Sequence, residues 1–318
     1  MSLNNSVSNS LKQRQSYGNT RAGNGKEQYY TNQPVAARCV QYAFDYFNKQ
    51  GISVSTVLEP CGGTGKFVEE LRSQPCTVIS CDIDPKHPDV AMADFLDKGS
   101  DPVFKNGRKL SSYQGLVCIT NPPFGRNNNL AIGFFKRMSE MSDYICIIVP
   151  KSWRKRSIIN KLPEDFHLVA DYELPSDSYH FEDGTKCDKG LLKTVFQIWK
   201  RGSTPRPKIC EPDHGLIKKI RPDSSGMVTG ANVSIYYSGS TTGKVTRLDG
   251  PVEANTASYY FDVHHPAVIE EMEKIDYQEI TNNAYVPSFS LQELNRELNK
   301  AFGLETQDLS WLEKIIGS

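Results

Sequence analysis

Short apolar runs alternate with segments of helical periodicity through residues 28–200. Apolar side chains recur at helical spacing over 34–48 and again near 129–141, which predicts two amphipathic helices. The apolar runs end in turn-forming or polar residues, as buried strands do. They predict strands at 56–58, 77–81, 90–93, 116–120, 144–149, 168–173 and 194–199. Strands that alternate with helices predict a doubly wound, mainly parallel α/β sheet. The long polar connection over 176–190 is compatible with an antiparallel closing pair.

The pattern changes after residue 200. Residues 201–207 are Pro-rich and basic, which is typical of a linker. Further on, 227–237 and 258–263 predict β-structure, and Ser290 and Glu293 form a capping box for a helix over 290–302. The sequence therefore predicts three parts: a flexible basic arm over 1–27, an α/β domain over 28–200 and a smaller C-terminal α+β region over 201–318.

Composition narrows the class of protein. Apolar residues make up 38% of the chain, enough for a sizeable core. No apolar run approaches the length of a membrane helix, and the start of the chain has no hydrophobic leader, so we expect no membrane partner. The eight cysteines contain no C-x-x-C pair and the six histidines do not cluster, so we expect no metal. Reduced cysteines predict an intracellular location, the cytoplasm or, in a eukaryote, the nucleus.

A glycine-rich turn follows the first predicted strand. The strand ends at Glu59-Pro60, and Gly62, Gly63 and Gly65 allow a tight turn and close approach of a ligand to the backbone. The turn is not a P-loop, because Phe67 stands where a Ser or Thr is needed, and it is not the dinucleotide fingerprint. On its own it indicates no more than a tight strand-to-helix turn.

Acidic residues end the next two predicted strands. Asp82, followed by Ile83, comes about twenty residues after the glycines, where an acid can bind ribose hydroxyls. Asp94 lies beside the aromatic Phe95 at the end of the third strand. These residues predict a nucleoside site without an obvious phosphate clamp. Such a site favours S-adenosylmethionine over NAD or ATP.

The sequence Asn121-Pro122-Pro123-Phe124 ends the fourth predicted strand. Two prolines lock the backbone and remove two N–H donors, so the Pro122 carbonyl can act as a fixed acceptor beside the Asn121 side-chain oxygen. Two acceptors match the two hydrogens of an exocyclic amine, and Phe124 offers a flat face to a base. A merely rigid loop is the alternative interpretation.

In this order the segments resemble class I S-adenosylmethionine-dependent methyltransferases, and specifically the N6-adenine enzymes with the motif N-P-P-[FY]. Residues 28–31, with Tyr30 and Thr31, look like motif X, and 59–65 look like motif I. Their order is similar to the gamma class of DNA amino-methyltransferases. The resemblance covers residues 28–200 and implies a Rossmann-like seven-stranded catalytic domain. It also implies cofactor contacts from Tyr30, Thr31, Glu59, Pro60, Gly62, Gly63, Gly65, Asp82, Ile83, Asp94, Phe95 and Asn121.

The resemblance implies a mechanism as well. The target adenine leaves its stack and enters the pocket. Asn121 and the Pro122 carbonyl accept from its N6 amine and orient the nitrogen toward the cofactor methyl, with Pro123 and Phe124 completing the catalytic motif. Transfer is then a single in-line displacement that depends on positioning.

A basic segment follows the fifth predicted strand. Lys151, Trp153, Arg154, Lys155 and Arg156 combine cations with one aromatic ring, which is typical of a nucleic-acid contact. A solvated helix start is the alternative. Neutral overall charge, with 37 basic and 37 acidic residues, does not exclude such a partner, because charge can gather locally.

The sequence predicts an enzyme that methylates adenine N6 in nucleic acid, with DNA favoured over RNA. An RNA adenine methyltransferase is the main alternative. Methylation of a protein glutamine amide and a catalytically silent nucleic-acid-binding subunit remain further ones. The sequence gives no signal of a nuclease partner.

Overall fold

The computed structural model describes residues 30–175, 177–180, 193–280, 287–305, 307 and 310–316. The predicted arm over 1–27 and most of the segment 176–190 lie outside them. The chain divides into two compact units, each treated by itself. Unit 1 contains the described residues of Met1–Lys151, Ser157–Pro207 and Leu312–Ser318, and unit 2 contains those of Ser152–Arg156 and Lys208–Trp311.

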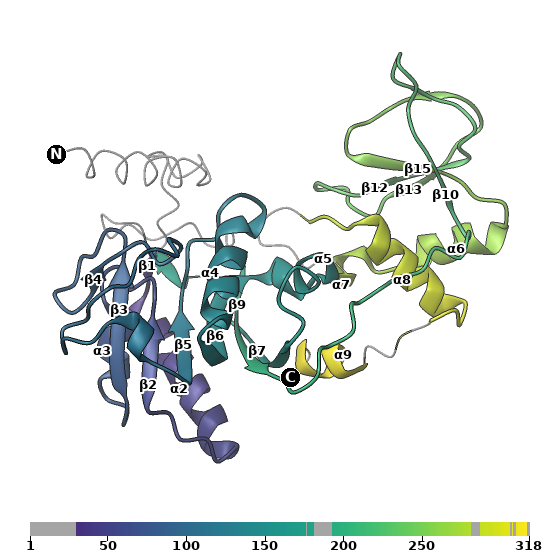
Figure 1. Ribbon diagram of the computed structural model, residues 1–318. Helices are drawn as coiled ribbons and strands as arrows, with labels where there is room; N and C mark the ends of the chain where they lie inside the picture. The colour runs from purple at the N-terminus through teal and green to yellow at the C-terminus, as the bar shows by residue number, and fades with distance from the viewer. Residues whose placement is uncertain are drawn as a thin grey trace. The chain divides into compact units, whose positions relative to one another are not determined.

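A seven-stranded sheet forms the centre of unit 1 (Figure 1). Its order is β4-β3-β2-β5-β6-β9-β7, and β9 runs antiparallel to both of its neighbours while the other pairs are parallel. This arrangement confirms the predicted Rossmann-like seven-stranded sheet with an antiparallel closing pair. The strands are β2 (Thr56–Glu59), β3 (Thr77–Asp82), β4 (Ala91–Met92), β5 (Leu116–Thr120), β6 (Ser142–Pro150), β7 (Phe166–Glu173) and β9 (Thr194–Arg201).

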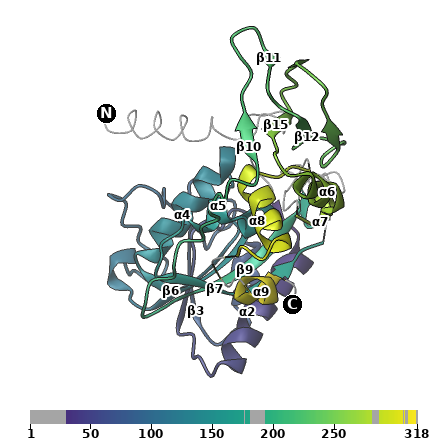
Figure 2. The same cartoon turned by 90° about the vertical axis from the view of Figure 1, so that its right-hand side faces the viewer.

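Helices cover both faces of this sheet (Figure 2). From α2 (Gln33–Lys49), Tyr42 stacks on Tyr172 of β7 with ring centroids 4.1 Å apart. From α4 (Asn129–Ser139), Phe135 packs edge-on against Trp199 of β9. Tyr172 lies opposite Phe196 and Trp199 lies three residues further along the strand, so the two aromatic contacts fall on opposite faces. Unit 1 also contains α3 (Lys66–Leu71) and 3-10 turns at Leu110–Ser112 and Arg126–Asn128. The 3-10 turn at Lys151–Arg154 and the helix α5 (Arg156–Ile159) cross the boundaries of the unit 2 segment Ser152–Arg156.

The carboxyl ends of the parallel strands meet at one edge of the sheet, where ligands bind in such folds. A small antiparallel pair also belongs to unit 1: β1 (Tyr30–Thr31) pairs with β8 (Tyr179–His180). This pairing joins the start of the described chain to the segment that follows β7.

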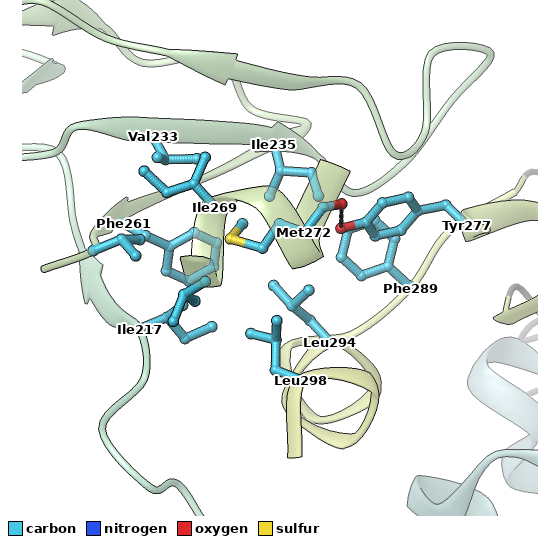
Figure 3. Packing of buried hydrophobic residues seen from close by; sticks show 12 residues of the cluster. Ile217, Val233, Ile235, Phe261, Ile269, Met272, Tyr277, Phe289, Leu294 and Leu298 are labelled. Carbon is cyan, nitrogen blue, oxygen red and sulfur yellow. Dashed lines mark hydrogen bonds between the residues drawn. The ribbon is translucent and has the colours of Figure 1, made fainter. Parts of the chain in front are cut away.

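Unit 2 is built on a four-stranded antiparallel sheet of order β10-β15-β12-β13. Side chains of Val233, Ile235 and Phe261 from this sheet surround Met272, and Leu294 and Leu298 approach it from a second helix (Figure 3). The elements are β10 (Lys218–Ile220), β12 (Val233–Tyr236), β13 (Val245–Arg247), β15 (Ser258–Asp262), the pair β11 (Met227–Val228) and β14 (Val252–Glu253), and the helices α6 (Pro266–Lys274), α7 (Tyr277–Ile280) and α8 (Leu291–Ala301). The last helix, α9 (Ser310–Ile316), contains the residue at which the chain returns to unit 1.

The structure contains the predicted capping box, but it places the boundary between the two units later in the chain than predicted. The predicted capping box is present, because the Ser290 hydroxyl accepts from Glu293 N and the Glu293 carboxylate accepts from Ser290 N. Residues 201–207, by contrast, are part of unit 1. Arg206 is buried there and donates to the carbonyls of Phe166 and Leu162, both at 3.0 Å. The boundary therefore lies after Pro207 rather than after Lys200.

Across the described residues, the structure contains no helix with the length and apolar character needed to cross a bilayer.

Candidate active site

A pocket in unit 1 opens at the carboxyl edge of the seven-stranded sheet. It brings together most of the residues that the sequence singled out, although they come from segments far apart in the chain. Those lining it are Tyr30, Thr31, Pro60, Gly62, Gly63, Asp82, Ile83, Asp94, Phe95, Asn121, Pro122, Pro123 and Phe124. Glu59 and Gly65 are not among the lining residues. Cys61, Thr64, Lys66, Phe67, Asp84, Ala93, Leu96, Leu130 and Phe134 also line it.

The three glycines of the turn have different roles. A Cβ on Gly62 would lie 2.2 Å from Ser80 Oγ, so this glycine lets the turn after β2 pass close to β3. Gly63 has a φ of +46°, and a Cβ there would meet the ring of Tyr30 at 3.4 Å, on the pocket side. Gly65 takes a left-handed conformation at the start of α3, where it is the N-cap residue. Gly63 is thus the glycine whose missing side chain leaves room in the pocket.

Asp82 is held in place at the end of β3. Its Oδ2 accepts from Gly63 N at 2.9 Å and its Oδ1 accepts from Asp84 N at 2.8 Å. Burial raises the pKa of the Asp82 carboxyl, although both of these hydrogen bonds lower it. The arrangement fixes a carboxylate beside the glycine turn, as a ribose contact requires.

Glu59 lies beneath the pocket rather than in its wall. Its side chain is fully buried, and Oε1 accepts from Thr120 Oγ1 at 2.8 Å and from Cys61 N at 3.0 Å. Burial raises the pKa of Glu59 to about 8, even though these two hydrogen bonds oppose the shift. Glu59 therefore joins the end of β2 to the end of β5, immediately before Asn121.

Part of the pocket wall is aromatic. Asp94 Oδ1 accepts from Leu96 N at 2.9 Å, which turns the chain so that Phe95 enters the wall. The ring of Phe95 stacks with that of Phe134, with centroids 5.7 Å apart and an interplanar angle of 15°. Phe134 belongs to α4, and its place in the apolar pattern of that helix predicts only a core residue. Its position four residues after Leu130 on the same helix is the signal that both could share a wall.

The Asn-Pro-Pro-Phe sequence lies directly against this space. Asn121 Nδ2 donates to Thr31 Oγ1 at 2.9 Å, across 90 positions of sequence. Phe124 lines the pocket but is only 4% exposed, so most of its ring is packed in the wall.

Charge in the pocket is mainly negative. Asp82, Asp84 and Asp94 line it, and Lys66 is the cation among the lining residues. A polyphosphate would be repelled by such a wall, whereas a ligand that carries positive charge would be attracted.

The basic segment after β6 is placed differently from the expectation. Trp153 has no exposed surface and Arg154 is 6% exposed. Within unit 2, Lys155 pairs with Glu293 at 3.4 Å and Arg156 forms a buried ion pair with Glu211. Lys151, in unit 1, pairs with Glu173 at 2.7 Å. Buried and paired side chains cannot offer their charge to a phosphate chain. We therefore withdraw Trp153, Arg154, Lys155 and Arg156 as nucleic-acid contacts. Lys151 remains a prediction, because its side chain is 26% exposed and its partner Glu173 is 62% exposed.

In the part of the chain that the structure describes, no group of three or more His, Cys, Asp or Glu side chains is arranged to hold a metal ion. The seven cysteines there are free thiols.

Comparisons with known proteins add structural likenesses. No family model matches the chain, and a search of curated proteins finds no match. A candidate RNA methyltransferase from Pyrococcus horikoshii is similar with a TM-score of 0.41 and 17% identity, over 55% of this chain and 87% of that one. The type I restriction-modification system methyltransferase subunit from Streptococcus thermophilus is similar with a TM-score of 0.37 and 16% identity, over 55% of this chain and 45% of that one.

A third likeness is to the Mtq2–Trm112 complex of E. cuniculi, which methylates the eRF1 translation termination factor. Its TM-score is 0.35 at 16% identity, over 56% of this chain and 99% of that one. At these scores none of the three determines a substrate. The assignment of the fold rests on the strand order of the sheet itself.

Proposed function

We propose that this chain transfers a methyl group from S-adenosylmethionine to the exocyclic N6 amine of adenine in nucleic acid, with DNA favoured over RNA. The observation that carries the proposal is that Asn121-Pro122-Pro123-Phe124 ends a central strand and lines the same pocket as Asp82 and Asp94. Methyl donor and acceptor amine would therefore meet in one space.

The pocket fits this cofactor by the chemistry of its walls. The Asp82 carboxylate would accept from ribose hydroxyls, and the mutually stacked rings of Phe95 and Phe134 would offer the adenine ring an aromatic surface on one side. The acidic lining suits a ligand with a sulfonium and an ammonium group. When bound, S-adenosylmethionine would supply an electrophilic methyl group.

The amine would be held by the catalytic motif. The Asn121 side-chain oxygen and the Pro122 carbonyl would accept its two hydrogens, and the two prolines would keep these acceptors in place. Both acceptors would stabilise the positive charge that develops on nitrogen as the methyl is transferred. The part of the Phe124 side chain that lines the pocket would contact the base.

The choice of DNA rests on the resemblance of the motif order to gamma-class DNA enzymes. Apart from Lys151, the cations that would contact the nucleic-acid backbone are to be sought outside the segment after β6. Lys218, Lys219 and Arg221 are exposed on and beside β10 of unit 2.

A substrate panel tests the proposal. The purified chain would be incubated with methyl-labelled S-adenosylmethionine and, separately, duplex DNA, structured RNA and a protein extract. Label in DNA is the expected result. Label in RNA alone would make RNA the substrate instead of DNA. Label in protein alone would make a protein amide the methyl acceptor instead of adenine. Binding of nucleic acid without methyl transfer would indicate a catalytically silent subunit.

A further inference from the structure

The side chain of Asn121 is held by a residue that lies 90 positions earlier in the chain. Asn121 Nδ2 donates to Thr31 Oγ1 at 2.9 Å, and Thr31 is 6% exposed. Both residues line the pocket. The hydrogen bond therefore lies in the wall against which a substrate amine would be placed.

Thr31 is itself firmly positioned. It belongs to β1, where it pairs with Tyr179 of β8, and the next residue donates its backbone N–H to the Ser178 carbonyl at 2.9 Å. Tyr179 is buried, and its hydroxyl donates to Thr194 Oγ1 at 2.7 Å at the start of β9. The Thr31 hydroxyl thus stands on backbone that is anchored to the central sheet.

The backbone of Asn121 is anchored as well, which leaves the rotation of its amide as the remaining freedom. Thr120 donates to the buried Glu59 on one side, and Pro122 restricts the chain on the other. The two ends of an amide are chemically opposite, because the oxygen accepts and the nitrogen donates. A substrate amine needs the oxygen. Because Nδ2 donates to Thr31 Oγ1, the amide oxygen Oδ1 lies on the side of the planar amide group away from Thr31.

We infer that Thr31 is a positioning residue for Asn121: its hydroxyl holds the amide in the orientation in which the oxygen serves as acceptor for the substrate amine. The substrate amine is part of the proposed function, so this part of the inference rests on it. The hydrogen bond between Thr31 and Asn121 does not depend on the proposed function. This role is distinct from binding the cofactor, which the resemblance to motif X implied for Thr31.

The kinetic test compares Thr31→Val, which keeps the shape and removes the hydroxyl, with Thr31→Ser, which retains it. Thr77→Val, an exposed position at the opposite end of β3 from the pocket, is the matched control. We expect Thr31→Val to lower kcat roughly tenfold to a hundredfold, as a misplaced catalytic group does, and Thr31→Ser to recover most of the loss. The Kd for S-adenosylmethionine should change by less than about twofold. A raised Kd with unchanged kcat would make Thr31 a cofactor-binding residue and overturn the inference.

A second readout does not depend on methylation. The ¹⁵N side-chain amide signal of Asn121 can be assigned by its loss in Asn121→Asp. Thr31→Val should shift this signal and speed its hydrogen exchange, Thr31→Ser should restore it, and Thr77→Val should leave it in place. If the wild-type chain methylates none of the substrates but the signal behaves this way, the proposed function fails and the inference stands. An unmoved signal would refute the inference whatever the activity.

Discussion

At the scale of single residues, Glu59 couples protonation to folding. Its carboxyl is fully buried, and burial raises its pKa from the ordinary 4.5 to about 8. The folded chain therefore holds this proton more tightly than the unfolded chain does. The stability that follows is complete below the unfolded pKa and is lost as pH rises through the folded pKa.

Glu59→Gln tests this coupling, because an amide resembles the protonated acid and does not titrate. We expect the free energy of unfolding of the wild type, relative to the variant, to fall between about pH 5 and about pH 9. Thermal or denaturant unfolding over that range measures it, with Glu253→Gln, at an exposed position, as control. A difference that is flat, or that rises with pH, would show that Glu59 is charged in the folded chain.

The sequence could predict which residues line the candidate site, because their signal is local. Asn121 to Phe124 are consecutive, and Asp82 and Asp94 each follow a recognisable strand. The basic segment at Lys151 could not be interpreted in the same way. Its partners Glu211 and Glu293 lie more than fifty positions along the chain, so a count of nearby acids missed them.

At the scale of elements, two glycines of the turn after β2 have different roles, one in packing and one in the pocket. Gly62→Ala would place a Cβ 2.2 Å from Ser80 Oγ and 2.7 Å from Val90, so we expect it mainly to destabilise the chain. Gly63→Ala would point its Cβ toward Tyr30 from a left-handed backbone, so we expect it mainly to weaken cofactor binding.

Unfolding curves and the Kd for S-adenosylmethionine measured on both variants check this separation. Gly250→Ala is the control, because a Cβ there meets nothing within 4 Å. Equal effects of both substitutions on Kd would contradict the division of roles.

Helix α8 offers a prediction about unit 2. The Ser290 hydroxyl satisfies a backbone donor at the start of the helix, and removing such a cap costs about 1 kcal/mol. Ser290→Ala should therefore raise the hydrogen-exchange rates of the first α8 amides by about fivefold, if they exchange by local opening. Ser240→Ala, in an exposed turn, should leave them unchanged. Unaltered α8 protection in Ser290→Ala would show that the cap contributes nothing there.

Long, periodic elements were easier to predict than short ones. The helix over 34–48 and the longer strands of the central sheet were predicted close to their positions, because each has a continuous run of buried apolar residues. The edge strand β4 is the exception, because it is two residues long and Met92 in it is 77% exposed. Strands such as β10 (Lys218–Ile220) and β13 (Val245–Arg247) are three residues long and largely exposed, so they have no apolar alternation to detect.

At the scale of the whole molecule, the ion pair between Arg156 and Glu211 replaces a predicted nucleic-acid contact. Both side chains are buried, at 6% and 9% exposure. Removing one partner leaves the other charge buried and unpaired, which lowers the free energy of unfolding by roughly 3–5 kcal/mol. Arg156→Met should therefore lower the melting temperature, and adding Glu211→Leu should recover most of the loss.

The salt dependence of nucleic-acid binding checks the same substitutions. Removing a cation that binds a phosphate would reduce the salt slope by about one. We expect Arg156→Met plus Glu211→Leu to leave the slope as in the wild type. A flatter slope in that stable double variant would return Arg156 to the interface.

The central claim is tested most directly by identifying the methylated atom. The wild type, Asn121→Ala and the exposed control Asn48→Ala would each be incubated with duplex DNA and S-adenosylmethionine, and the digested nucleosides analysed by mass spectrometry. We predict N6-methyladenine from the wild type and from Asn48→Ala. We predict a loss of at least about a hundredfold in Asn121→Ala, with cofactor binding nearly intact. Methylation of another atom, or undiminished N6-methyladenine from Asn121→Ala, would contradict the account.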